Sequence, residues 1–259
     1  MIERQKPTSP LGQVGIILVG PKFPENIGAS ARVASNFGIS ELAVVSSEDY
    51  DQERMLRMAT HKAAHLIHGM RVCKTTAEAA APYHCIVGTT ARQGRRRLED
   101  QTPREVMAQV APMLEGNNIG IMFGPEDAGL TNEDLDYCQF ASTIPTAGFS
   151  SLNLAQAVAI HCYELYTTLH THPYAGVPQS DLANSFELEG MYEHIEEALG
   201  EITFLHDTNR VYWMRNIRQF LGRVKLKKKE SSLIRGVCRK FLWHSRHHDQ
   251  AMPEKEQEA

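Results

Sequence analysis

Short apolar runs alternate with amphipathic segments over the first two thirds of the chain. The five apolar runs are Val14–Gly20, Glu41–Ser47, His84–Thr90, Asn118–Gly124 and Ala141–Thr146. Runs of this length between turn residues are typical of buried strands. Helical character is found between and after them in Asn26–Phe37, Asp51–His68, Pro103–Glu115, Thr131–Tyr137 and Ser151–His170. This alternation predicts an α/β fold, a parallel sheet flanked by helices on both faces.

The pattern changes after residue 170. Residues 171–181 contain two prolines and one glycine and predict a linker between a first domain, 1–170, and a C-terminal extension, 182–259. The extension is strand-poor, and its periodicity predicts a small all-helical unit whose last residues are disordered. Its predicted helices are Met191–Leu199, Asp207–Leu221 with Asp207 as its cap, and a basic helix, Ser231–Trp243, that opens at Ser231 or Ser232.

Charge is distributed very unevenly along this extension. The formal net charge of the chain is −4, which by itself does not indicate a nucleic-acid partner. However, residues 181–201 carry seven acids and no Lys or Arg, whereas residues 210–246 carry twelve Lys or Arg and one acid, Glu230. So concentrated a basic block indicates a polyanionic partner.

Composition excludes several classes of protein. With 42% hydrophobic and 22% charged residues the chain is that of a globular protein, and it has no apolar stretch long enough to cross a membrane and no signal-peptide pattern. We therefore expect a cytoplasmic protein without a membrane partner. The five cysteines lack CxxC spacing, which favours reduced thiols. His61, His65 and His68 share one helical face, but no carboxylate or cysteine accompanies them, so we expect no metal.

Candidate chemistry lies in the loops that follow the strands, because ligands bind at the carboxyl ends of a parallel sheet. These loops are residues 20–32, 89–97, 123–131 and 148–154, and they carry glycines and serines rather than a nucleophile with its base. Small residues allow main-chain groups to approach a ligand such as an adenine ring closely. Neither GxxxxGK[ST] nor GxGxxG follows a strand, so a nucleotide-binding metabolic enzyme of the Rossmann type is the weaker alternative.

The ordered combination of these loops resembles the SPOUT RNA methyltransferases. The three matching motifs are Asn26…Gly28…Arg32, then Phe123-Gly-Pro-Glu126…Gly129-Leu130, then Ser150-Ser-Leu-Asn-Leu-Ala155, and the resemblance covers residues 14–170. It implies the SPOUT α/β knot, in which the carboxyl end of the domain is threaded as a trefoil knot, an exception to the usual rules of chain connection. It also implies a pocket for S-adenosyl-L-methionine (SAM), released as S-adenosyl-L-homocysteine, and a homodimer formed through the knotted domain.

The resemblance assigns roles to individual residues. Those implied to bind SAM are Thr89, Thr90, Ala91, Gly124, Ile144, Ser150, Ser151 and Leu152. Those implied to be catalytic are Arg32, Ser151, Asn153 and Asn26. Because a guanidinium does not release its proton in proteins, we expect Arg32 to orient a phosphate and stabilise a developing oxyanion rather than act as a base.

Within this family, three segments resemble the branch that methylates the ribose 2′-hydroxyl of tRNA nucleotide 32, in the anticodon loop. They are Gly88–Arg92, Gly129–Leu135 and the basic tail from Arg215 to Gly236, while Pro125 stands where that branch often carries Arg. The predicted tRNA-binding residues are Arg32, Arg92, Arg95, Arg96, Arg97, Arg223, Lys225, Lys227, Lys228 and Lys229. Trp213 and Trp243 could stack on RNA bases, but their helical spacing favours a position in the core for both. The alternatives are another tRNA position, rRNA, or an RNA-binding protein of this fold that has lost catalysis.

Overall fold

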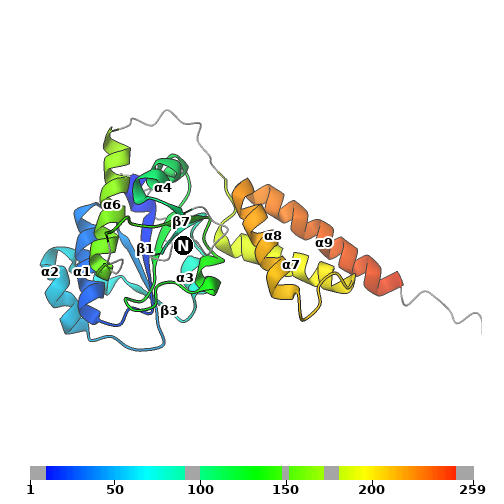
Figure 1. Cartoon of the computed structure of the whole chain (residues 1–259), viewed down its shortest axis with the longest axis horizontal. Helices are drawn as coiled ribbons and strands as arrows, with labels where there is room; N and C mark the ends of the chain where they lie inside the picture. The colour runs from blue at the N-terminus through cyan, green and yellow to red at the C-terminus, as the bar shows by residue number, and fades with distance from the viewer. Residues whose placement is uncertain (1–9, 91–99, 148–151, 172–180, 249–259) are drawn as a thin grey trace, which may run out of the picture. The chain divides into compact units, whose positions relative to one another are not determined.

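The computed structural model describes residues 10–90, 100–147, 152–171 and 181–248. The chain divides into two compact units, residues 1–185 and 186–259 (Figure 1). The predicted linker lies mostly outside the described residues, as do the last residues, which the sequence predicts to be disordered.

The first unit is built on a seven-stranded sheet in the order β3-β2-β1-β6-β4-β7-β5, and every neighbouring pair is parallel. The strands are β1 (Val14–Val19), β2 (Glu41–Val45), β3 (Arg71–Cys73), β4 (Cys85–Thr89), β5 (Asp100–Gln101), β6 (Ile119–Phe123) and β7 (Phe140–Ser142). All five predicted strands are present. The prediction missed the two short edge strands, β3 and β5, and extended β7 four residues too far, since the backbone leaves the sheet after Ser142.

Helices cover both faces of this sheet. They are α1 (Pro24–Asn36), α2 (Gln52–His68), α3 (Thr76–Ala80), α4 (Pro103–Val110), α5 (Asn132–Leu135) and α6 (Leu154–Thr171), with 3₁₀ turns at Pro10–Gln13 and Ala111–Leu114. The larger apolar core lies between the sheet and α1, α2, α4 and α6, and the smaller core lies under α3 and α5 on the opposite face (Figure 1). Of these helices, α3 was not predicted.

One aromatic side chain explains two strand glycines. The ring of Tyr83 is 1% exposed and lies across β1 and β6, where a Cβ on Gly15 would overlap its hydroxyl and a Cβ on Gly120 would lie 3.1 Å from the ring. Burial raises the pKa of Tyr83 to about 12. The two glycines therefore make room for the tyrosine in the core.

Helix α2 contains a strained residue. Thr60 has φ 61° and ψ 172° in the middle of the helix, a region that β-branched residues rarely adopt. Earlier in α2, at Met55, helix α1 approaches so closely that a Cβ on Gly28 would overlap the Met55 carbonyl oxygen. The helix is kinked at Thr60, a few residues after the point where α1 and α2 pack this closely.

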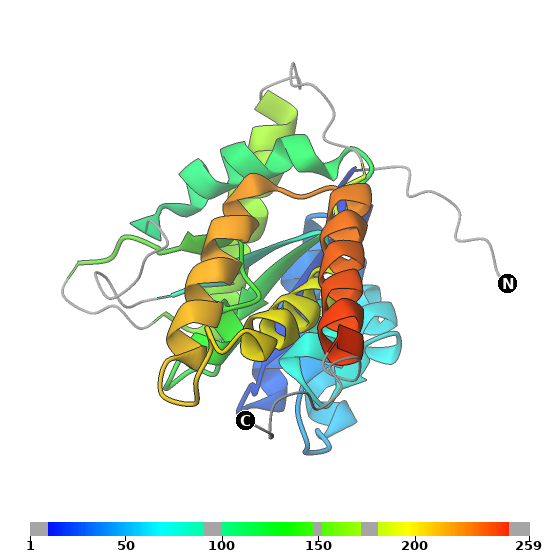
Figure 2. The ribbon, with the colours of Figure 1, turned by 90° about the vertical axis from the view of Figure 1, so that its right-hand side faces the viewer.

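The second unit consists of α7 (Ser185–Glu201), α8 (Arg210–Val224) and α9 (Lys228–His248), with α8 and α9 joined by a short turn (Figure 2). The three predicted helices are confirmed, but all three starts are wrong, and α7 begins at Ser185 rather than Met191. Helix α8 has Asn209, not Asp207, at its N-cap, and α9 begins before Ser231, where the Glu230 carboxylate accepts a hydrogen bond from the Lys227 N–H.

Ion pairs in this unit use part of the basic block. Acids of α7 pair with cations of α8 and α9, most closely in the two-pronged contact of Arg218 with Glu189, at 2.5 and 2.7 Å. The other pairs are Arg210–Glu196, Lys228–Glu187 and Arg246 with Glu197 and Glu201. The acidic and basic segments of the sequence therefore partly neutralise each other.

None of the described helices combines the length and hydropathy required of a membrane-spanning segment.

Candidate active site

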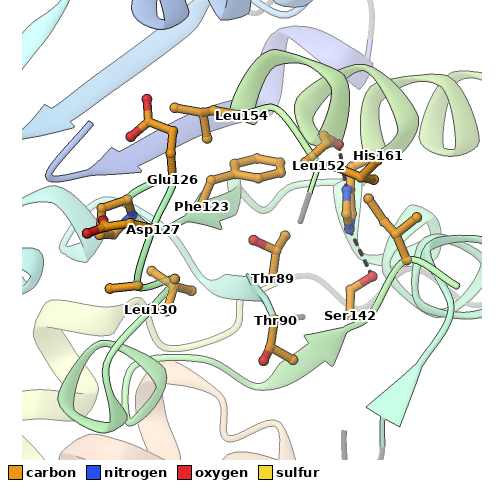
Figure 3. A pocket seen from close by; sticks show the side chains of 16 residues that line it. Thr89, Thr90, Phe123, Glu126, Asp127, Leu130, Ser142, Leu152, Leu154 and His161 are labelled. Atoms are coloured by element: carbon orange, nitrogen blue, oxygen red, sulfur yellow. Dashed lines mark hydrogen bonds between the residues drawn. The ribbon is translucent and has the colours of Figure 1, made fainter. Parts of the chain in front are cut away.

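A cavity of about 300 Å³ lies at the carboxyl ends of β4, β6 and β7 (Figure 3). Its walls come from four segments that are far apart in sequence, the turns after these three strands and the first half of α6. The lining residues are Thr89, Thr90, Phe123, Gly124, Pro125, Glu126, Asp127, Ala128, Gly129, Leu130, Ser142, Ile144, Leu152, Leu154, Ala157 and His161. This is the edge of a parallel sheet at which ligands bind.

The cavity brings together all five of the predicted SAM-binding residues that the structure describes. Thr89, Thr90, Gly124, Ile144 and Leu152 all line it. The other three, Ala91, Ser150 and Ser151, lie outside the described residues. The roles of all eight stay predictions.

The two ends of the cavity differ in chemistry. Glu126 and Asp127 lie at one end, whereas Ser142 and His161 lie at the other, with Phe123 between them (Figure 3). The Phe123 ring meets the His161 ring edge-on, with 5.3 Å between centroids. A ligand with a cationic end and a planar apolar end fits this arrangement.

At the acidic end, a hydrogen-bond chain joins the three predicted motifs. Asn153 donates from Nδ2 to Asn26 Oδ1 at 3.0 Å, and Asn26 donates from Nδ2 to Glu126 Oε1 at 2.6 Å. Asn153 Oδ1 accepts from the Ala155 N–H at 2.9 Å, in the first turn of α6. Each amide is therefore held in one orientation, because its oxygen accepts and its nitrogen donates.

The same carboxylate anchors the turn that follows β1. Glu126 Oε2 accepts a hydrogen bond from the Lys22 N–H at 2.9 Å, and the Lys22 ammonium lies 2.5 Å from Asp127. The hydrogen bond that the Lys22 ammonium donates to Asp127 holds the pKa of this carboxyl below its usual value. Two adjacent acids thus connect the turn after β6 to the turn after β1.

Arg32 lies away from this chain of amides. It is on the exposed side of α1, does not line the cavity, and makes no hydrogen bond or ion pair with any residue that the structure describes. Its guanidinium is therefore not engaged by the part of the chain that the structure describes.

At the other end, His161 is completely buried on α6. Its Nδ1 is 2.8 Å from the Ala157 carbonyl oxygen and its Nε2 is 2.9 Å from Ser142 Oγ (Figure 3). Burial lowers the pKa of His161 to about 4, although the contact with the Ala157 carbonyl opposes this shift. The imidazole is therefore neutral at physiological pH.

Sequence reasoning assigned no role to Glu126, Ser142 or His161. Glu126 was part of the second motif and carried a signal, as one of two adjacent acids in a turn after a strand. His161 lies on the apolar side of its helix, among the buried positions Val158, Cys162 and Leu165, a pattern that more often marks a satisfied core histidine. Only the contact between α6 and β7 shows that it borders the cavity.

Among the described residues, no group of three or more His, Cys, Asp or Glu side chains is arranged to hold a metal ion.

Comparison with known proteins identifies the family. The profile of the SpoU rRNA Methylase family matches residues 13–163. The chain belongs to the SpoU methylase family. A second profile, that of the C-terminal domain of the tRNA methyltransferase TrmJ, matches residues 186–252, so the SpoU methylase domain is followed by a helical unit similar to that of TrmJ.

Several SpoU methylases are similar over most of their length. The tRNA (cytidine/uridine/adenosine-2′-O-)-methyltransferase TrmJ of Pseudomonas aeruginosa is 33% identical over 239 residues, which cover 88% of this chain and 93% of the relative. The tRNA (cytidine-2′-O-)-methyltransferase TrmJ of Methanocaldococcus jannaschii is 37% identical over 158 residues, 60% of this chain and 67% of the relative. The crystal structure of TrmJ from Z. mobilis ZM4 has a TM-score of 0.76 at 30% identity and covers 88% of this chain and 98% of its own.

The SpoU methylase match covers β1 to the middle of α6, and it therefore contains every turn that lines the cavity. The predicted family and its parallel α/β fold are confirmed. The trefoil knot within the SpoU methylase domain stays a prediction.

Proposed function

We propose that this protein transfers a methyl group from SAM to the ribose 2′-hydroxyl of a tRNA nucleotide, at position 32 of the anticodon loop. The observation that carries the proposal is the cavity, which is lined by residues of the second and third motifs and is joined to the first motif by the hydrogen bond from Asn26 to Glu126. The tRNA substrate is supported by the names of the similar TrmJ proteins and by the match of the second unit to the TrmJ C-terminal domain.

The size and the charge of the cavity support SAM as its ligand. Its volume of about 300 Å³ is at the lower end of the range for small-molecule sites. The backbone at Gly124 passes so close to Gly129 and Leu130 that a Cβ would overlap them, which leaves main-chain groups rather than a side chain at this wall. Glu126 and Asp127 provide negative charge for a cationic ligand. When bound, SAM supplies the methyl group on a positively charged sulfur.

The chain's own residues position the acceptor. Asn26 and Asn153 are oriented by their mutual hydrogen bond and by Glu126, so both amides are fixed before an RNA arrives. Pre-ordered approach of this kind is worth about 7–11 kcal/mol in favourable cases. Ser151, two residues before Asn153 in the third motif, completes the predicted catalytic set.

Arg32 acts on the RNA rather than on SAM. Its guanidinium orients the phosphate next to the target ribose and stabilises the charge that develops on the 2′-oxygen, a contribution of about 2.7–4 kcal/mol for comparable donors. Arg32→Lys is expected to lose most turnover and retain SAM binding, measured by methyl transfer and by calorimetry. Near-normal turnover would contradict this role.

A homodimer forms through the first unit. The exposed surface of α1 and α6 carries an aromatic cluster, in which Phe37 meets Tyr163 at 6.5 Å and Tyr166 at 5.7 Å between ring centroids. Tyr163 is 56% exposed and Tyr166 38% exposed in the single chain. Such a cluster supports an apolar subunit interface next to the helix that carries Arg32.

The basic turn between α8 and α9 contacts the tRNA backbone. Lys225, Lys227 and Lys229 make no ion pair among the described residues, whereas Lys228 is paired with Glu187 at 2.7 Å. Arg223 donates to the Gln219 carbonyl of its own helix and keeps its charge. The other predicted RNA contacts, Arg92 and Arg95–Arg97, lie outside the described residues.

Salt dependence tests this turn. Replacing Lys225, Lys227 and Lys229 by Gln is expected to lower the slope of log affinity against log salt by about 2, because each contact with a single-stranded phosphate contributes about 0.7. The matched control is Lys228→Gln, which removes a cation already neutralised by Glu187 and should leave the slope within error. An unchanged slope in the triple variant would remove the turn from the RNA-binding surface.

The decisive experiment maps 2′-O-methyl groups by mass spectrometry in tRNA from cells with and without the gene. We expect loss of the modification at nucleotide 32 and its restoration by purified protein with SAM. Loss at another tRNA position or in rRNA would retain the chemistry and change the substrate. No change in any RNA, together with no SAM binding, would refute the proposal.

A further inference from the structure

The contact between His161 and Ser142 determines where one proton lies. The Ala157 carbonyl oxygen can only accept a hydrogen bond, so the proton of the imidazole is on Nδ1. Since the ring is neutral, its Nε2 carries a lone pair. Ser142 Oγ, 2.9 Å away, must therefore be the donor.

This assignment restricts what Ser142 offers to a ligand. A serine hydroxyl normally donates one hydrogen bond and accepts two, rotating to suit its partner. Here its one proton is directed to His161, and Oγ makes no other hydrogen bond within the described residues. The lone pairs that are left make this hydroxyl an acceptor only.

The position of Ser142 places that acceptor at the cavity. Ser142 and His161 both line it, at the end away from Glu126 and Asp127 (Figure 3). Ser142 is 1% exposed and His161 is fully buried, so a hydrogen bond made here is shielded from water. Phe123, edge-on to His161, provides an apolar wall for a planar ring.

We propose that Ser142, with its proton committed to His161, selects a purine that has an amino group at C6 over one that has an oxygen there. An adenine amino group donates to the Ser142 lone pair. The 6-oxygen of hypoxanthine would face that lone pair as a second acceptor, and the hydroxyl could turn its proton to the ligand only by leaving Nε2 of His161 without a donor. This inference rests on the proposed function, which places an adenosyl group in this cavity.

Calorimetry on the full chain tests the inference without any turnover. The two probes are S-adenosyl-L-homocysteine and S-inosyl-L-homocysteine, which differ only at C6 and the adjacent ring nitrogen. We expect the wild-type protein to bind the adenosyl compound more tightly and Ser142→Ala to reduce the ratio of the two affinities about tenfold, the usual effect of one buried hydrogen bond. His161→Leu should reduce the ratio similarly, because the freed hydroxyl can then donate to the 6-oxygen.

A neighbouring hydroxyl provides the matched control. Thr143 follows Ser142, is 8% exposed and does not line the cavity, and its buried Oγ1 has no hydrogen-bond partner among the described residues. Thr143→Val, which keeps the shape and removes the hydroxyl, should leave the affinity ratio unchanged. Thermal melting of each variant shows whether it is folded, and Ser142→Ala, the smaller change, decides the matter if His161→Leu does not fold.

The outcomes separate the two proposals. A wild-type ratio near one, or a preference that Ser142→Ala leaves intact in a folded protein, overturns the role of Ser142. If the wild-type protein binds neither compound, the proposed SAM site is itself wrong. If Thr143→Val changes the ratio as much as Ser142→Ala does, the effect is a general one of strand β7, and the assignment to Ser142 is overturned.

Discussion

We expect Glu126 to fix the orientation of the Asn26 and Asn153 side-chain amides. Its carboxylate accepts from Asn26 Nδ2 at 2.6 Å and from the Lys22 N–H at 2.9 Å, one hydrogen bond to each oxygen. Glu126→Gln replaces one of these oxygens by an NH₂ group, so that one of the two donors faces another donor. A hydrogen bond to a charged group is worth about 1.5–3 kcal/mol.

If that free energy is lost from the alignment of Asn26, kcat/KM for methyl transfer falls about 10- to 100-fold. SAM binding is expected to weaken as well, because Glu126 itself lines the cavity and carries negative charge there, so kcat is measured at saturating SAM. The assay is methyl transfer to purified tRNA with SAM and tRNA varied separately, together with calorimetry of SAM binding. At saturating SAM the loss in kcat should remain, which separates the alignment of Asn26 from the weaker SAM binding.

The matched control is Glu25→Gln, one residue before Asn26. Glu25 lies on the same first turn of α1, but its carboxylate is paired with Arg54 at 2.7 Å on an exposed surface. Loss of such a pair has little effect, so kcat/KM should stay within about twofold of the wild-type value. If Glu126→Gln is as active as Glu25→Gln, or if both lose activity alike, Glu126 does not act by holding Asn26.

Four further predictions concern stability, measured by urea unfolding unless stated. Gly15→Ala should lower the free energy of unfolding by about 1–3 kcal/mol, because its Cβ overlaps the buried Tyr83 hydroxyl, and adding Tyr83→Phe should recover part of the loss. Thr60→Gly should raise the free energy of unfolding by about 1 kcal/mol, since glycine adopts φ 61° without strain, and a matching gain in Thr60→Ala would refute this explanation. Thr143→Val should raise the free energy of unfolding or leave it unchanged, because it removes a buried hydroxyl that has no partner in the described part of the chain; a loss above about 1 kcal/mol would contradict this explanation. His161 should make the protein less stable as pH falls from about 6.5 to about 4, by about 3 kcal/mol in total, because in that range the unfolded state binds a proton that the folded state excludes; in thermal melts His161→Leu should show a correspondingly weaker pH dependence.

The repeating pattern of the sequence was sufficient to predict the main elements of the fold. Each of the five short apolar runs contains or overlaps a strand, because strands inside a parallel sheet are buried on both faces and are therefore largely apolar. The missed strands, β3 and β5, are three and two residues long, and so short a segment carries no period. Their pairing depends on the neighbours β2 and β7 that the fold brings beside them.

The start of α8 shows a different kind of limit. Asp207 is a common N-cap residue, but the helix begins after Asn209, whose side chain instead accepts a hydrogen bond from the His206 N–H. Two suitable caps within three residues compete, and local propensity does not decide between them. The basic block is a similar case, since its charge was evident from the sequence while the pairing of Arg218 with Glu189 was not.

The sequence alone therefore determined the alternation of strands and helices, the basic extension and the motif turns that line one cavity, since each depends on residue type and spacing along the chain. Only the tertiary structure decided which side chains share a proton or a charge. Glu126 reaches Asn26 across 100 residues, and His161 reaches Ser142 from another element. Hydrogen bonds act over about 3 Å, so they are set by the packing of α6 on the sheet and by the close approach of two turns, and no sequence spacing encodes that distance.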